Sequence, residues 1–260
     1  MSEVLAFFPS GDMILYLVVM GFMAAFIDSV VGGGGLISVP TLLAAGLNPV
    51  LALGTNKAAA VMGAATGAFT FFRSGKVDMS LMKYLFPAAF LGSIGGVIVL
   101  RQIPPDFLRP LVVVLLVVVT LYSVFKKEWG KENTYGGLTP TILRLSILAS
   151  TVIGFYDGFF GPGAGSFLLF SFLLIGFDFV RAAANARAIN FASNLGSVLF
   201  FIAIGEVDFS YSIPMGLSMI VGAQCGARVA LAKGAAYVRP LFLIVTSVMI
   251  GKQIYTLICG

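Results

Sequence analysis

The chain has 260 residues, of which 59% are hydrophobic and 10% are charged, and its mean hydropathy is +1.03. In soluble domains roughly a quarter of the residues are charged, so this composition excludes a soluble globular protein. It predicts an all-α polytopic membrane protein. The formal net charge of +5 is modest, and we expect its bases to orient the chain in a lipid bilayer rather than to bind nucleic acid.

The first half of the chain contains five apolar segments, each bounded by glycine, proline or charged residues that end helices. They are predicted at residues 13–31, 36–46, 51–72, 80–100 and 107–125. A helix needs roughly 20 residues to cross a bilayer, so the second segment is too short for a straight crossing. It either crosses a thinned or water-filled region or is re-entrant.

The second half repeats this plan, with segments predicted at residues 141–160, 164–176, 179–204, 210–232 and 238–259. The matched pairs are Asp28 with Asp157, Gly32 with Gly161, Gly34 with Gly163 and Asn56 with Asn185, all at one constant offset. We therefore predict a duplication in one membrane domain of 8 to 10 segments. The first repeat covers residues 1–130, a polar linker covers 131–140, and the second repeat covers 141–260.

The distribution of charge favours one orientation of these repeats. If the short segment crosses, each half has five crossings and the repeats are inverted; if it is re-entrant, each half has four and they are parallel. With five crossings, one side holds Arg73, Lys76, Lys126, Lys127, Lys131, Arg181, Lys233 and Arg239. The other side holds Glu3, Asp12, Glu206 and Asp208, with only Arg101 and Arg109 as nearby opposing bases. Because bases concentrate on the cytoplasmic side, we predict inverted repeats with both termini outside the cytoplasm.

Glycines interrupt an apolar helix at the same place in each half. The first break holds Gly32, Gly33, Gly34 and Gly35, and the second holds Gly161 and Gly163. Backbone that leaves a helix inside lipid needs protein or water around it, and the next helix presents free N–H groups that suit an anion. Paired broken helices predict the substrate site of a duplicated transporter, although a packed interhelical turn is the alternative. Gly92, Gly96, Gly222 and Gly226 are instead expected to pack helices closely.

Bases and amides form the second candidate site. Its predicted ligands are Asn56 and Lys57 in the first half and Asn185, Arg187, Asn190 and Asn194 in the second. The last three share one helix face, and buried bases are costly, so we predict two cationic, amide-lined half-sites for a small anion. Alternatively, both bases lie near helix starts and extend to the membrane interface. At the constant offset Lys57 aligns with Ala186, so the two bases are not expected to play equal roles.

Asp28 and Asp157 precede the two breaks at matched positions. They are candidate carriers of a coupling ion, partners of Lys57 and Arg187, or residues that end helices. Tyr156 and Asp157 resemble the Tyr-Asp element of intramembrane aspartyl proteases, but their Gly-x-Gly-Asp element is absent here. Since the chain also lacks histidine, we predict no enzyme, no metal site and no cofactor.

The duplicated aspartate with its glycine break, the GTNK motif at 54–57 and the NFASNLG run at 190–196 resemble the sulfite exporter TauE/SafE family, also called the 4-toluene sulfonate uptake permease family. The resemblance covers nearly the whole chain. It implies a multi-pass inner-membrane secondary transporter for a small sulfur-containing anion, such as sulfite, a sulfonate, sulfoacetate or thiosulfate. We expect alternating access with a proton or sodium ion as the candidate coupling ion; the alternatives are an anion channel or a carrier for another organic anion.

Overall fold

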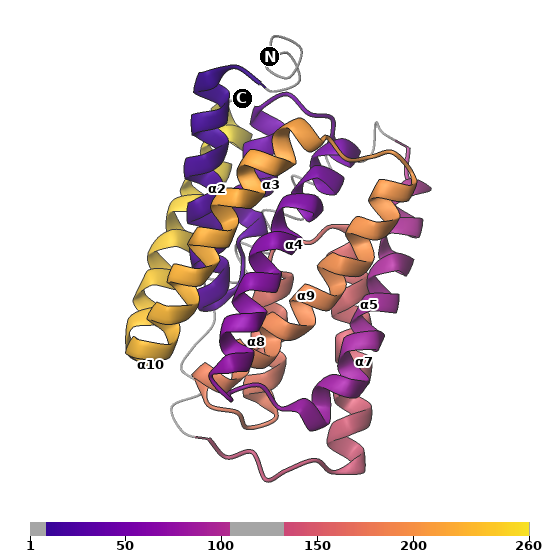
Figure 1. Cartoon of the computed structure of the whole chain (residues 1–260), viewed down its shortest axis with the longest axis vertical. Coiled ribbons are helices and arrows are strands. Elements are labelled where there is room, and N and C mark those ends of the chain that lie inside the picture. The colour runs from indigo at the N-terminus through magenta and orange to yellow at the C-terminus, as the bar shows by residue number, and fades with distance from the viewer. Residues whose placement is uncertain (1–8, 105–132, 260) are drawn as a thin grey trace.

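The computed structural model describes residues 9–104 and 133–259, and every regular element in these two stretches is an α-helix. The helices are α2 (Gly11–Val31), α3 (Gly35–Ala44), α4 (Pro49–Arg73), α5 (Met79–Arg101), α7 (Pro140–Phe159), α8 (Ala164–Leu174), α9 (Phe179–Ala203) and α10 (Phe209–Cys259). They stand side by side in an upright bundle (Figure 1). The all-helical prediction is confirmed, and the predicted segment 107–125 lies outside the described residues.

Capping side chains set the starts of four long helices. Asn48 accepts a hydrogen bond from the Leu51 amide at 3.0 Å, and Asp178 accepts one from Val180 at 3.0 Å, so α4 and α9 begin in the same way. Asp78 and Asp208 likewise cap α5 and α10 by accepting from Ser80 and Ser210. The two halves therefore begin equivalent helices with equivalent signals.

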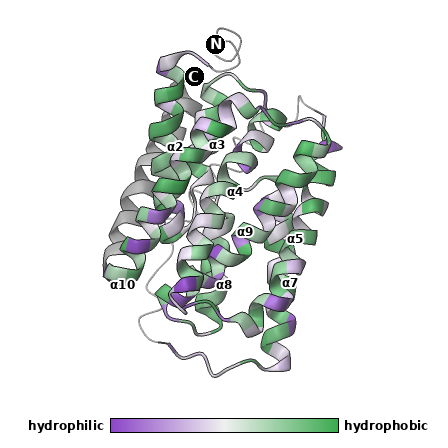
Figure 2. Cartoon of the chain, viewed as in Figure 1, coloured by the Kyte–Doolittle hydropathy of each residue, from purple (hydrophilic) through white to green (hydrophobic). Residues whose placement is uncertain are grey.

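Five described helical stretches are long and apolar enough to cross a membrane: α2, α5, α7, α9 and the Phe209–Gly234 part of α10. α10 breaks at Gly234, where φ is 61° and ψ is −160°. Large apolar side chains on α7, such as Leu145, Leu148 and Val152, are more than half exposed, as lipid contact requires. Figure 2 shows hydrophobic residues along these helices and hydrophilic residues gathered mainly toward the lower end.

Glycines bring helices from opposite halves into close parallel contact. Gly222 and Gly226 on α10 lie against the backbone of Phe22 and Phe26 on α2, and Gly92 and Gly96 on α5 lie in the same way against α7. A Cβ atom at any of these four glycines would come within 2.4 Å of a backbone carbonyl oxygen. The prediction that these glycines pack helices closely is confirmed.

Adjacent glycines on α5 provide a test of this packing. A Cβ atom on Gly96 would lie 2.0 Å from the Phe155 carbonyl oxygen, whereas one on Gly95 would lie 3.6 Å from the Phe155 ring. We expect Gly96→Ala to lower the free energy of unfolding in micelles by about 1–3 kcal/mol through overpacking. Gly95→Ala should leave it unchanged or raise it, because alanine favours helix. Equal effects of the two substitutions would contradict this account.

The central helices α4 and α9 run antiparallel. Gly54, near the start of α4, lies against Glu206, which follows the end of α9. At the other end, the Asp78 amide, after α4, donates to Asn185 near the start of α9 at 2.8 Å. Because these helices hold equal places in the two predicted repeats, their opposite directions support inversion, which stays a prediction.

The short helices α3 and α8 lie in the upper and lower halves of the bundle (Figure 1). Each turns back from a break rather than crossing the whole height, so α4 begins at the same end as α2. The first turn of α2 and the last turn of α10 also share that upper end. This arrangement gives the same sides to the connections as the five-crossing prediction, although α3 and α8 each cover only part of the height of the bundle.

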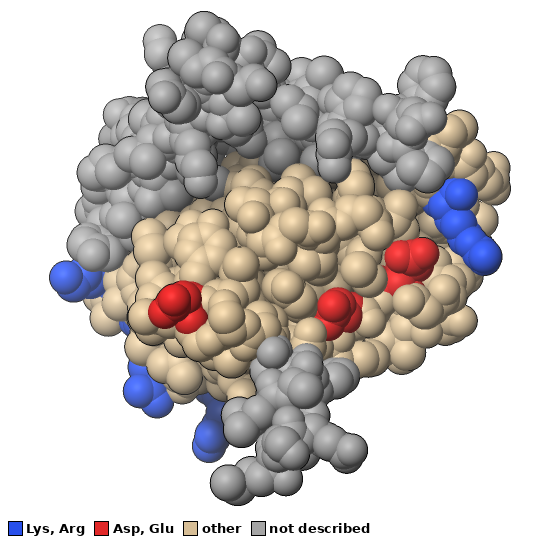
Figure 3. Space-filling model, turned by 90° about the horizontal axis from the view of Figure 1, so that it is seen from above, with Lys and Arg blue, Asp and Glu red and all other residues tan. Residues whose placement is uncertain are grey.

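Charges differ between the two ends of the bundle. Asp12, Glu206 and Asp208 lie at the upper end, at the start of α2 and between α9 and α10, whereas Arg73 and Arg181 lie at the lower end of α4 and α9. Figure 3 shows acidic residues spread over the upper face and basic residues at its outer edge. Bases predominate at the lower end, as the sequence grouping predicts, although the caps Asp78 and Asp178 also lie there and Arg101 ends α5 at the upper end.

Candidate functional site

The two glycine breaks meet at the centre of the bundle. Ser166 on α8 donates a hydrogen bond from its Oγ to the Val31 carbonyl oxygen at 3.2 Å. A Cβ atom on Gly32 would lie 2.3 Å from the Ser166 nitrogen, and one on Gly35 would lie 2.9 Å from the Cα of Pro162. Gly32 also has a φ of 76°, so glycine is needed there both for the left-handed backbone and for the close approach. The breaks are thus packed turns that contact each other.

Lys57 on α4 and Asp157 on α7 form a buried ion pair beside the second break. Lys57 Nζ lies 2.6 Å from Asp157 Oδ1, and the two side chains are only 2% and 3% exposed. The other carboxylate oxygen accepts a hydrogen bond from Ser193 Oγ, with the amide nitrogens of Asn190 and Asn194 at 3.4 and 3.5 Å. Both oxygens of Asp157 therefore have partners inside the protein.

Arg187 on α9 and Asp28 on α2 form the second ion pair, beside the first break. Asp28 Oδ2 accepts from Arg187 Nη1, and Asp28 Oδ1 accepts from the Gly34 amide at 3.0 Å, where α3 begins. The Arg187 side chain is 4% exposed, but that of Asp28 is 22% exposed. Each predicted repeat thus supplies the acid for the base of the other.

Asn190 connects the two ion pairs. Its Oδ1 accepts from Arg187 Nη1 at 3.2 Å, while its Nδ2 faces Asp157 Oδ2 at 3.4 Å. Four charges, two of each sign, are therefore gathered in one polar cluster that is neutral overall. The bases are buried two turns inside their helices, which contradicts the alternative that they extend to the membrane interface.

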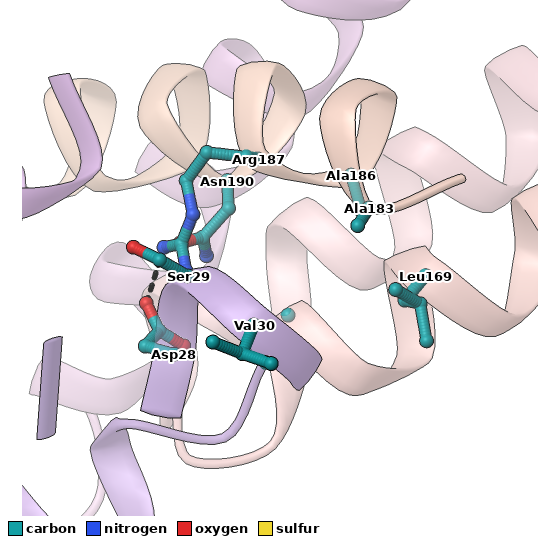
Figure 4. A pocket seen from close by; sticks show the side chains of 10 residues that line it. Asp28, Ser29, Val30, Leu169, Ala183, Ala186, Arg187 and Asn190 are labelled. Carbon is teal, nitrogen blue, oxygen red and sulfur yellow. Dashed lines mark hydrogen bonds and ion pairs between the residues drawn. The ribbon is translucent and has the colours of Figure 1, made fainter. Parts of the chain in front are cut away.

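A small pocket opens beside the Asp28–Arg187 pair (Figure 4). The space available to the centre of a water-sized sphere is about 10 Å³, roughly the room that one ordered water needs. Ser29 lines the pocket and is 2% exposed, and its Oγ has no hydrogen-bond partner among the described residues. The lining residues are Asp28, Ser29, Val30, Gly32, Gly165, Leu169, Ala183, Ala186, Arg187 and Asn190.

The other predicted ligands occupy different positions. Gly161 lies next to Lys57, since a Cβ atom there would be 2.9 Å from Nζ, and Gly163 is the N-cap of α8. Asn56 is buried with its Oδ1 unpartnered in the described part of the chain. Asn185 accepts from Asp78 and donates to the Arg181 carbonyl oxygen at 2.8 Å, so it joins α9 to α5 away from the pocket.

The helix bounds correct the alignment of the two halves. α4 (Pro49–Arg73) and α9 (Phe179–Ala203) have equal lengths, which makes Lys57 equivalent to Arg187 rather than to Ala186. Asn185 is then equivalent to Thr55, and Thr55 Oγ1 indeed accepts from the Asp208 amide at 2.9 Å, as Asn185 accepts from Asp78. The pairing of Asn56 with Asn185 was wrong because α8 has 11 residues where α3 has 10.

Two serines at the site were missed by the sequence reasoning. Ser193 follows Asn190 by three residues and therefore shares its helix face, which was a usable signal. Ser29 directly follows Asp28, but its counterpart in the second half is Gly158, so a search for duplicated residues passes over it.

Comparisons with known proteins identify relatives over most of the chain. Residues 17–252 match the family model described as sulfite exporter TauE/SafE. The probable membrane transporter protein YfcA of Escherichia coli K12 is 37% identical over 243 residues, which cover 93% of this chain and 89% of that protein. A probable membrane transporter protein of Haemophilus influenzae is 36% identical over 245 residues, covering 94% and 95%. No solved structure matches the chain.

Proposed function

Because this chain belongs to the sulfite exporter TauE/SafE family, we propose that it is a secondary transporter of a small sulfur-containing anion of the sulfite, sulfonate, sulfoacetate or thiosulfate class. The observation that carries this proposal is the pair of buried bases, Lys57 and Arg187, beside two chain breaks that meet at the centre of the bundle. A buried base within a membrane helix is costly and marks the path of an ion or substrate.

The arrangement of helices supports alternating access. One parallel pair, α2 with α10, lies on one side of α4 and α9, and the other, α5 with α7, lies on the opposite side (Figure 1). Between these pairs, the two breaks contact each other through glycine backbone and through the hydrogen bond from Ser166 to Val31. Rocking of the two halves about α4 and α9 would open the central cluster first to one side and then to the other.

The charge separation supports an orientation in the inner membrane. The basic lower end, with Arg73 and Arg181, would face the cytoplasm, which places the start of α2 on the opposite side. A carrier is favoured over an anion channel because the pocket beside Arg187 has room for about one water. Saturable, trans-stimulated flux is the expected behaviour of a carrier, and ohmic current that of a channel.

Thermal stabilisation of the detergent-purified protein tests the substrate class. We expect at least one of sulfite, thiosulfate, sulfoacetate and a simple sulfonate to raise the melting temperature above that in chloride at equal ionic strength. A ligand at about 100 times its Kd stabilises the folded state by about 2.7 kcal/mol. If chloride and all the sulfur anions gave the same melting temperature up to saturating concentration, the proposed substrate class would be wrong.

A further inference from the structure

We propose that the substrate anion competes with Asp28 for Arg187, and that the displaced Asp28 carboxylate takes up a proton, so that one anion and one proton bind together. The Lys57–Asp157 pair then stays closed throughout as a structural partner. This inference rests on the proposed function and specifies its binding site and its coupling ion. The proposal rests on a difference between the two ion pairs. A strict duplication would make these pairs alike, but the structure shows that they differ in exposure and in their neighbours.

The Asp28 carboxylate already occupies an anion site. One of its oxygens accepts from the Arg187 guanidinium and the other from the Gly34 amide at 3.0 Å, at the start of α3. A charged guanidinium and a helix N-terminus are the donors that bind oxyanions in proteins. A sulfonate or sulfite presents oxygens with a similar charge, so it can take the place of this carboxylate.

An unused donor in the pocket points to a ligand there. Ser29 Oγ has no hydrogen-bond partner among the described residues, although the residue is 2% exposed. Leaving a buried hydroxyl unpaired is costly, which favours a bound water or substrate oxygen at this place. Figure 4 shows Ser29 beside Asp28 and Arg187, so a hydroxyl group and a guanidinium lie next to the carboxylate that an incoming anion would replace.

The second ion pair lacks these features. Asp157 is 3% exposed, against 22% for Asp28, and Ser193, Asn190 and Asn194 all approach it. Where the first half has Ser29, the second has Gly158, and a Cβ atom there would lie 1.9 Å from the Ser93 carbonyl oxygen. The Ser93 backbone fills the place where a side chain like Ser29 would stand, so no equivalent hydroxyl donor is offered to an anion beside Lys57.

Charge balance calls for one added positive charge when a monovalent anion binds, and a proton on Asp28 supplies it. Arg187 is the base that faces Asp28, from α9; α3 presents the neutral Gly34 amide, and α8 presents Gly165. The other charges of the cluster, Lys57 and Asp157, lie across Asn190 and neutralise each other. A monovalent anion that takes Arg187 leaves Asp28 as an unpaired charge, and one added proton on its carboxylate restores a neutral cluster.

Binding of a fully ionised probe tests the exchange. With a simple sulfonate, which carries a single negative charge at neutral and alkaline pH, the wild type in weakly buffered micelles should take up about one proton per anion, and its affinity should fall as pH rises, by up to about tenfold per pH unit. Asp28→Asn frees Arg187 without a charge, so it should bind at least about tenfold more tightly at alkaline pH, with no proton uptake and no pH dependence. Asp157→Asn, where it folds, should keep the proton uptake.

The outcomes separate this inference from the proposed function. Anion affinity that does not change with pH in the wild type would overturn the exchange, as would proton uptake that persists in Asp28→Asn. Loss of binding in Asp28→Asn as complete as in Arg187→Gln would also overturn it. In each of these cases the wild type still binds a sulfur anion. A wild type that binds none of the anions would instead contradict the proposed function itself.

Discussion

Replacing Asp157 with asparagine should lower the free energy of unfolding by about 3–5 kcal/mol, because it leaves Lys57 as a buried charge without a counterion. The Lys57 side chain is 2% exposed and its Nζ lies 2.6 Å from the carboxylate that the substitution removes. Asparagine keeps the size of the side chain, so the loss reports the charge rather than a cavity. Denaturant titration in mixed micelles measures this change.

A double substitution separates the ion pair from general damage. Asp157→Asn combined with Lys57→Met removes both charges, and we expect it to recover most of the lost stability, because paired removal of buried charges is often neutral. Asp28→Asn should cost less than Asp157→Asn, since Asp28 is 22% exposed and solvent can reach it. Equal losses for the two asparagine variants would show that the ion pairs are equivalent, contrary to our account.

Replacing Arg187 with glutamine should weaken the binding of the sulfur anion by about 100-fold, or roughly 3 kcal/mol, because a buried charged donor is lost. Isothermal titration of the purified variant measures the affinity. The variant also leaves Asp28 without its base, so stability is expected to fall as well. Arg187→Gln combined with Asp28→Asn restores a neutral cluster, and should recover stability without recovering affinity.

Two control variants test whether the loss of anion affinity is specific to Arg187. Asn185 lies on the same helix as Arg187 but bonds to Asp78 and Arg181, so Asn185→Ala should leave the anion affinity unchanged. Arg73→Gln removes an exposed base at the end of α4 and tests whether net charge alone matters. If Arg73→Gln weakened binding as much as Arg187→Gln, general electrostatic attraction would explain the result and the site would lie elsewhere.

The helices followed from the sequence because their signals are local. Apolar length, the caps at Asn48 and Asp178 and the glycine breaks act within a few residues along the chain. The described helices therefore begin and end within a few residues of the predicted segments, including the break in α10 at Gly234. The close packing at Gly96 and Gly226 could be predicted for the same reason, since regularly spaced small residues in an apolar helix favour it.

The contacts of the charged residues could not be read from the sequence. Asp28 and Arg187 are 159 residues apart in the sequence. Whether Asp28 pairs with Arg187 or with Lys57 depends on how the two halves pack against each other. The extra residue of α8 also shifted the alignment, which hid the equivalence of Lys57 and Arg187. Asn185 looked like a ligand because polar residues are rare in such a helix, yet its hydrogen bonds join two helices.

Counterflow of a labelled sulfur anion into proteoliposomes tests most directly whether this chain is an anion carrier that works through Arg187. The wild type should accumulate label only when unlabelled anion fills the vesicles, with uptake that saturates. Arg187→Gln should abolish this uptake, while Asn185→Ala retains it. Uptake by Arg187→Gln at the wild-type rate, or an unsaturable flux that ignores the anion inside the vesicles, would contradict the account.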